Sequence, residues 1–208
     1  MSELRADLAL VADQIPPGSR VLDLGCGDGE LLRFLMTVQS CEGLGVEHDK
    51  TAIMDAIDAG VPTLDLDIDS QLSLFADASF DVVVLSRTLQ AVRHPVEVLG
   101  QMGRIGARLI VSMPNFAYWP HRLTLLRGAM PRSSDLPFDW FDTPNLHFAT
   151  LTSLESLFDS LGFEIEYRAA LTASGRPVGW LANVRAGSAI YVLVNHSVTC
   201  LGAAHSVP

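Results

Sequence analysis

Apolar residues recur along the chain in blocks that fit helices and strands in turn. From Leu4 to Ile15 they follow a helical spacing, which predicts an amphipathic helix before the turn at 16–18. Five later apolar runs predict strands at residues 20–24, 43–47, 61–66, 80–85 and 107–113. Helical patterns separate these runs, one beginning after Asp49 and one at Pro95. Strands joined through helices predict a parallel, doubly wound sheet.

The C-terminal third has a different pattern. Thr152 and Glu155 fit a capping box, which predicts a helix from there to about Gly162. Two further apolar runs, 163–170 and 188–195, lack a crossover helix between them and predict an antiparallel hairpin. We therefore expect one α/β domain over residues 1–195 with a seven-stranded, mostly parallel sheet. Residues 196–208 have no periodicity and are expected to form a loose tail.

Composition narrows the class of protein. The chain has 208 residues, of which 49% are hydrophobic and 18% charged, so it can bury a large core. A net charge of −10 disfavours a non-specific nucleic-acid binder. We expect a cytoplasmic protein without membrane association, because no apolar run is long enough to span a bilayer and no secretory signal is visible. Three scattered cysteines favour neither a disulfide framework nor a zinc site, and no metal is expected.

A glycine-rich segment after the first predicted strand carries the main chemical signal. Glycines occupy positions 25, 27 and 29, but the dinucleotide pattern GxGxxG would need a glycine where Glu30 stands. A pyrophosphate there would also lie beside Asp23 and Asp28, which would repel it. S-adenosylmethionine has no phosphate and carries a sulfonium and an ammonium group, so an acidic loop suits it better.

Two later carboxylates complete the predicted cofactor site. Glu47 is placed to accept hydrogen bonds from both ribose hydroxyls, and Asp67 to accept one from the adenine amino group. The expected site for S-adenosylmethionine or S-adenosylhomocysteine therefore comprises Asp23, Gly25, Cys26, Gly27, Gly29, Glu47 and Asp67. A purely structural glycine turn is the alternative. We interpret Cys26 as a small residue that fits the tight turn rather than as a nucleophile, and Asp65 and Asp69 as solvated charges rather than metal ligands.

The motif set resembles class I S-adenosylmethionine-dependent methyltransferases, in which the last strand lies between two earlier ones. Within that superfamily the chain is most similar to the methionine biosynthesis protein MetW family. The stretches that carry this resemblance are 19–32, 88–92, 114–116 and 142–147. His48 and Arg87 depart from the expected pattern, where an apolar residue and a glutamine are usual. The resemblance implies association with homoserine O-acetyltransferase as a partner or activator. A free-standing methyltransferase acting on a small carboxylate or hydroxyl acceptor is the alternative.

An aromatic-rich segment follows the fifth predicted strand. Residues 116–150, called the insertion below, hold seven of the 15 aromatic residues of the chain. The insertion fits a lid over an acceptor, a docking surface or a small satellite core, with Trp119, Trp140 and Phe141 as lid or partner-binding residues. Catalytic residues are not identified; His121 and His147 are the candidate general bases.

Overall fold

The computed structural model describes residues 4–195, and all its strands belong to one seven-stranded sheet. The helices and strands, in chain order, are α1 (Ala6–Ala12), β1 (Arg20–Leu24), α2 (Glu30–Val38), β2 (Glu42–Glu47), α3 (Lys50–Asp58), β3 (Thr63–Asp65), the 3₁₀ helix η1 (Leu72–Leu74), β4 (Phe80–Ser86), α4 (Pro95–Ile105), β5 (Gly106–Pro114), α5 (Trp119–Leu126), α6 (Leu151–Ser160), β6 (Glu164–Leu171), α7 (Ala182–Arg185) and β7 (Ser188–Val194). The tail expected at 196–208 lies outside the described residues.

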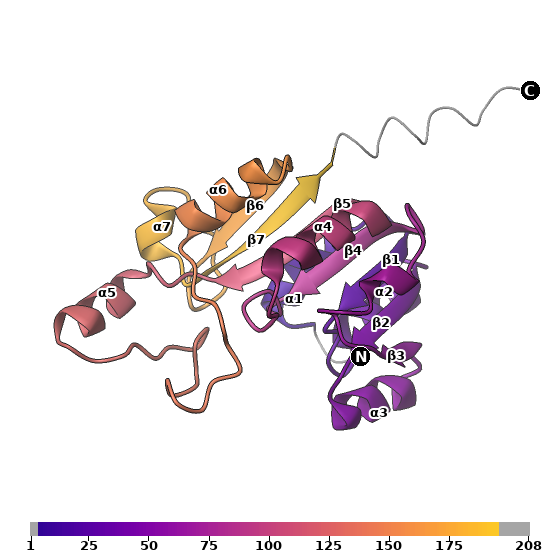
Figure 1. The fold of residues 1–208 in the computed structure, drawn as a ribbon, viewed down its shortest axis with the longest axis horizontal. Helices are drawn as coiled ribbons and strands as arrows, with labels where there is room; N and C mark the ends of the chain where they lie inside the picture. The colour runs from indigo at the N-terminus through magenta and orange to yellow at the C-terminus, as the bar shows by residue number, and fades with distance from the viewer. Residues whose placement is uncertain (1–3, 196–208) are drawn as a thin grey trace, which may run out of the picture.

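The strand order is β3-β2-β1-β4-β5-β7-β6 (Figure 1). Strands β1 to β5 pair in parallel, whereas β7 pairs antiparallel with both β5 and β6. The predicted mostly parallel sheet, its C-terminal hairpin and the insertion of the last strand between two earlier ones are therefore confirmed. The order reverses at β1 and β4, and ligands of open α/β sheets bind at such a point, beyond the carboxyl ends of the strands.

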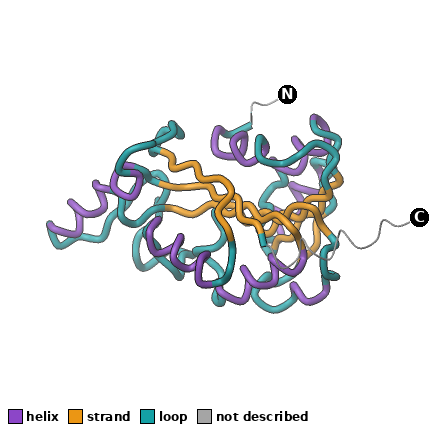
Figure 2. Tube along the Cα trace, turned by 90° about the horizontal axis from the view of Figure 1, so that it is seen from above, coloured by secondary structure: helices purple, strands orange, loops and turns teal. Residues whose placement is uncertain are grey.

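Helices cover both faces of the sheet, as Figure 2 shows from above. One apolar core packs α1, α2 and α3 against the sheet, and a second packs α4, α6 and α7 against the other face. Strand β4 is buried on both faces from Val82 to Leu85, as its continuous apolar run predicts. This double cover makes the central strands a rigid base for the loops at their ends.

Two predicted helix boundaries are wrong. The first helix ends at Ala12, although Ile15 is still buried in the turn that follows. The capping box predicted at Thr152 is not formed, because the N-cap of α6 is Thr150, whose hydroxyl accepts from the Ser153 N–H. Glu155 instead accepts hydrogen bonds from Arg168 and from the Tyr191 hydroxyl, so it joins α6 to the hairpin.

No helix within residues 4–195 combines the length and apolar character needed to cross a membrane.

Candidate functional site

The glycine loop between β1 and α2 lies at the reversal of strand order. All three glycines have positive φ, +75° at Gly25, +56° at Gly27 and +75° at Gly29. A side chain would be strained at each of them. At Gly27 an added Cβ would meet no atom within 4 Å, so this peptide faces open space that a ligand could approach.

Most backbone N–H groups of the loop donate hydrogen bonds to acceptors within the protein. Five of the six N–H groups from Gly25 to Glu30 donate to acceptors of the chain itself: Gly25 and Cys26 to the Val46 carbonyl, Gly27 to Glu47, Gly29 to the Cys26 carbonyl and Glu30 to Asp28. A phosphate cradle requires free N–H groups. The loop therefore disfavours a pyrophosphate through its hydrogen bonds as well as through its charge.

Asp23 at the end of β1 is a buried carboxylate beneath this loop. Its side chain is 3% exposed, and its Oδ1 has no hydrogen-bond partner among the described residues. Burial, and secondarily the negative charge of Glu47, raises the pKa of Asp23 to about 7. A buried carboxylate without a partner is costly to the fold alone, so it points to a cationic or hydrogen-bonding ligand.

Glu47 at the end of β2 supports the loop from the neighbouring strand. Its Oε2 accepts from the Gly27 N–H at 2.9 Å, and its Oε1 accepts from His48 and Asp49 at 2.8 and 3.0 Å. A carboxylate has about four acceptor sites, of which three are occupied here. The free acceptor site of Glu47 could bind one ribose hydroxyl. A second hydroxyl could bind only if it replaced one of the three backbone N–H donors. The ribose role of Glu47 stays a prediction.

The acidic residues at the end of β3 and just after it have distinct roles. Asp67 accepts from the Asp69 N–H and the Ser70 hydroxyl, and the first of these bonds mainly lowers its pKa. It keeps acceptor sites for an adenine amino group, and this role too stays a prediction. Asp65 is exposed and contacts His48 at 3.2 Å. The interpretation of Asp69 as a solvated charge is wrong, because its carboxylate accepts from the Arg93 and His94 backbone and is only 12% exposed. It closes the loop before α4.

Cys26 lies in the glycine loop close to the carboxylates of Asp23 and Glu47. Burial, together with the charges of Asp23 and Glu47, raises the pKa of the Cys26 thiol to about 12. The thiol therefore stays protonated and packs in the loop, where it is 8% exposed. Within residues 4–195 no group of three or more His, Cys, Asp or Glu side chains is arranged to hold a metal ion.

A cavity of about 250 Å³ opens beside the glycine loop. Residues of the loop line it together with Arg5 and Leu8 near α1, and with Ser86, Arg87 and Thr88 at the end of β4. Ligand pockets usually measure about 300 to 1,000 Å³. The cavity is therefore large enough for only part of a nucleoside-sized ligand.

Arg87 forms a bridge that the sequence analysis missed. Its backbone is left-handed, with φ of +55°, and its guanidinium contacts Asp135 at 2.7 Å and Asp7 at 3.2 Å. Asp7 belongs to α1 and Asp135 to the insertion, so one side chain on the cavity wall joins three parts of the chain. The departure from the family pattern at position 87 was the available signal. No sequence spacing indicates which acidic residues pair with it.

The candidate bases lie away from the loop. His121 is buried against Phe116 and Tyr118, and neither ring nitrogen has a hydrogen-bond partner among residues 4–195. Burial lowers its pKa, so the ring is neutral at pH 7. His147 is half-buried, and its Nε2 also lacks a partner in the described part of the chain. Of the described residues, none from the insertion lines the cavity at the glycine loop. The structure thus does not bring His121 or His147 to that cavity.

Comparisons with known proteins agree with this architecture. Among solved structures, the chain is similar to a SAM-dependent methyltransferase, described as a possible histamine N-methyltransferase, from Thermotoga maritima, with TM-score 0.68 and 19% identity. That match covers 91% of this chain and 88% of the other. Magnesium protoporphyrin IX methyltransferase from Synechocystis PCC 6803, solved with bound SAH, matches with TM-score 0.64 and 17% identity over 92% and 81% of the two chains. At such identities these likenesses establish the Rossmann-like methyltransferase fold.

Sequence comparison identifies the family. The Bifunctional methionine biosynthesis protein MetXA/MetW of Rhodopirellula baltica is 36% identical over an alignment of 175 residues, and the match covers 78% of this chain. The match spans only 28% of that relative's length. The family model of Methionine biosynthesis protein MetW matches residues 5–193, nearly all of the described chain. The chain therefore belongs to the MetW family of methionine biosynthesis proteins, built on the methyltransferase fold.

Proposed function

We propose that this protein binds S-adenosylmethionine or S-adenosylhomocysteine at the glycine loop and acts as a partner or activator of homoserine O-acetyltransferase. The observation that carries the cofactor assignment is the buried Asp23 Oδ1, which has no hydrogen-bond partner among residues 4–195 and lies beneath a loop with few free N–H donors. When bound, S-adenosylmethionine would supply a positively charged methylsulfonium. The residues at hand fit such a ligand, because Gly27 leaves space above the loop and Asp23, Glu47 and Asp67 provide acceptors.

The proposed partnership with homoserine O-acetyltransferase rests on a relative whose name joins two proteins in one chain. The name of the Rhodopirellula baltica protein pairs MetW with MetXA, the name of homoserine O-acetyltransferases. Proteins fused in one organism often associate as separate chains in another. This supports a complex between the present chain and the acetyltransferase of its host.

Two experiments test cofactor binding and the partnership separately. Isothermal titration with S-adenosylmethionine, S-adenosylhomocysteine and NAD should show binding of the adenosyl compounds alone; binding of NAD and of neither adenosyl compound would refute the cofactor assignment. Co-expression with the homoserine O-acetyltransferase of the same host should yield a complex and raise acetyltransferase activity. If the purified chain alone accumulates a methylated product and no complex forms, the free-standing methyltransferase on a small carboxylate or hydroxyl acceptor becomes the better description.

Affinity for S-adenosylmethionine should rise with pH. Because the pKa of Asp23 is raised to about 7, the ligand-free site is largely protonated below that pH. A cationic ligand favours the ionised carboxylate, so binding releases a proton. Affinity should therefore fall by up to about tenfold per pH unit below pH 7 and level off above it.

Titrations between pH 5.5 and 8.5, in buffers of different ionisation enthalpy, would count the protons released. Asp23→Asn should flatten the profile while S-adenosylhomocysteine, which lacks the sulfonium charge, shows a weaker dependence on pH. A profile for the natural protein that is flat across this range would contradict the proposed role of Asp23.

A further inference from the structure

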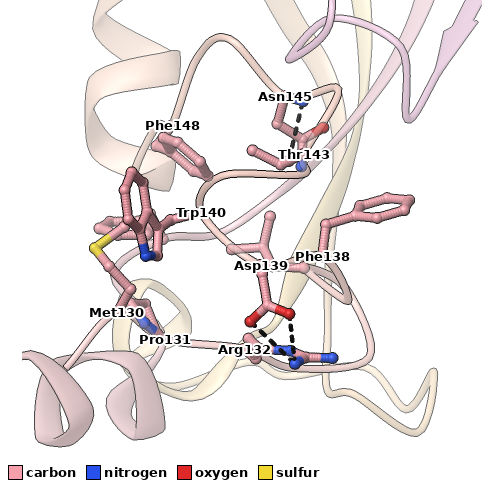
Figure 3. A pocket seen from close by; sticks show the side chains of 11 residues that line it. Met130, Pro131, Arg132, Phe138, Asp139, Trp140, Thr143, Asn145 and Phe148 are labelled. Carbon is pink, nitrogen blue, oxygen red and sulfur yellow. Dashed lines mark hydrogen bonds and ion pairs between the residues drawn. The ribbon is translucent and has the colours of Figure 1, made fainter.

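A second cavity, of about 150 Å³, lies within the insertion (Figure 3). Its apolar lining includes Phe116, Met130, Leu136, Phe138, Trp140 and Phe148. This volume is well below the roughly 300 to 1,000 Å³ of typical small-molecule pockets. The cavity therefore suits an anchor residue of another protein better than a metabolite.

The rim of this cavity exposes large apolar side chains. Trp140 is 69% exposed and Phe141 72%, and the two rings contact each other edge to face. Met130, Phe138 and Phe148 are each close to half exposed. Contiguous exposed rings around a pocket mark a protein interaction site, and tryptophan is among the residues most often dominant at interfaces.

The cavity wall is ordered by polar contacts of the insertion itself. Arg132 contacts both carboxylate oxygens of Asp139 at 3.1 Å, and the Thr143 hydroxyl accepts from the Asn145 N–H (Figure 3). Ser133 and Leu136 exchange backbone hydrogen bonds, which close the turn between them. A surface arranged in advance loses less conformational entropy on binding.

Charge distinguishes the insertion from the rest of the molecule. Residues 116–150 hold three arginines and three aspartates, so this segment is neutral while the chain carries −10. Arg127 is exposed, next to α5, and forms no ion pair among the residues described. A neutral, apolar face, with the exposed Arg127 three residues before the lining residue Met130, fits a partner that offers an apolar side chain and a carboxylate.

The cavity of the insertion and the cavity at the glycine loop share no lining residue, although Asp135 of the insertion reaches Arg87 on the wall of the latter. Figure 1 shows α5 at one end of the molecule and α3 at the other. As noted above, no described residue of the insertion lines the cavity at the glycine loop. These observations favour docking over a lid.

We propose that the cavity of the insertion receives one apolar side chain of homoserine O-acetyltransferase, with Trp140 as the rim anchor and Arg127 facing an acidic group. This inference rests on the proposed function. The relative that carries MetXA and MetW in one polypeptide supplies the reason to choose this occupant over a second copy of the chain.

The test measures affinity for the purified acetyltransferase with three variants. Trp140→Ala removes the rim anchor and should weaken the complex at least about thirtyfold. Met130→Trp should weaken it about tenfold or more, because the larger ring blocks the cavity while adding apolar surface. Met54→Ala, a control on α3 with a side chain 59% exposed, should change nothing. Circular dichroism verifies the fold, and all three variants should keep the affinity of the natural protein for S-adenosylhomocysteine.

The outcomes separate this inference from the proposed function. If the natural protein forms a complex and both Trp140→Ala and Met130→Trp bind within twofold of it, the cavity is not the docking site although the partnership holds. If the natural protein forms no complex, the partnership itself fails. If sedimentation shows a dimer of this chain that Trp140→Ala dissociates, the occupant is a second copy and the assignment to the acetyltransferase is overturned. If Trp140→Ala loses the adenosyl ligand while it stays folded, the insertion is a lid.

Discussion

Gly27→Val should abolish binding of S-adenosylmethionine and S-adenosylhomocysteine. An added Cβ at Gly27 would meet no atom of the described residues within 4 Å and would project into the space above the loop, where we expect the ligand to approach the backbone. The φ of +56° adds strain of roughly 1–2 kcal/mol for a residue with a side chain. Titration calorimetry would measure the loss of binding, and thermal unfolding the loss of stability.

Gly18→Val is the matched control for this prediction. Gly18 also has positive φ, +76°, and an added Cβ there also meets no atom within 4 Å, but it lies in the turn before β1. The two variants should lose similar stability, and only the one at position 27 should lose the ligand. Equal ligand affinity in the two variants would mean that the ligand does not lie over Gly27.

The sheet could be predicted because the apolar runs and helix caps that define its strands and helices are local in sequence. The apolar run of β4 is nearly continuous since both faces are covered, and Asp49 does cap α3 by accepting from the Ala52 N–H. The antiparallel position of β7 followed from the absence of a crossover helix. The start of α6 was wrong because Thr150, not Thr152, caps the helix, and Glu155, which would complete the predicted capping box, accepts instead from Arg168 and Tyr191.

The site was predictable only in part, because much of it depends on contacts between distant segments. The sequence pattern located the loop and its acidic neighbours. It did not reveal that Glu47 accepts from the loop at Gly27 and from the backbone of His48 and Asp49, or that the Asp23 Oδ1 has no hydrogen-bond partner among the described residues. The roles of Glu47 and Asp67 toward a ligand remain predictions. The bridge from Arg87 to Asp135 spans 48 residues and follows no local rule.

Arg87→Met should destabilise the protein by about 2 kcal/mol, between the values typical of exposed and of buried ion pairs. Asp135 is buried, its Oδ2 already lacks a partner among the described residues, and Arg87 is the cation that contacts its Oδ1. Arg87 itself is 38% exposed, which is why the expected loss is smaller than for a fully buried pair. Methionine keeps much of the apolar side-chain length and does not change the requirement for a left-handed backbone.

The loss of stability in Arg87→Met should depend on pH. Burial raises the pKa of Asp135, and Arg87 opposes this shift. Without the guanidinium, the folded-state pKa rises further above the unfolded value, so the folded protein binds a proton more tightly than the unfolded chain. The variant should therefore lose stability as pH rises from the pKa of Asp135 in the unfolded chain to its raised pKa in the folded protein. Its free energy of unfolding should differ less from that of the natural protein at pH 5 than at pH 8.

Adding Asp135→Asn to Arg87→Met should recover most of the lost stability, because the double variant no longer buries an unpaired charge. Urea unfolding at pH 5 and pH 8 would measure all three proteins. A single variant that is equally unstable at both pH values, and that Asp135→Asn does not rescue, would show that Arg87 acts through packing rather than through its charge. Recovery by the second substitution would instead show that the loss comes from the unpaired, buried charge of Asp135.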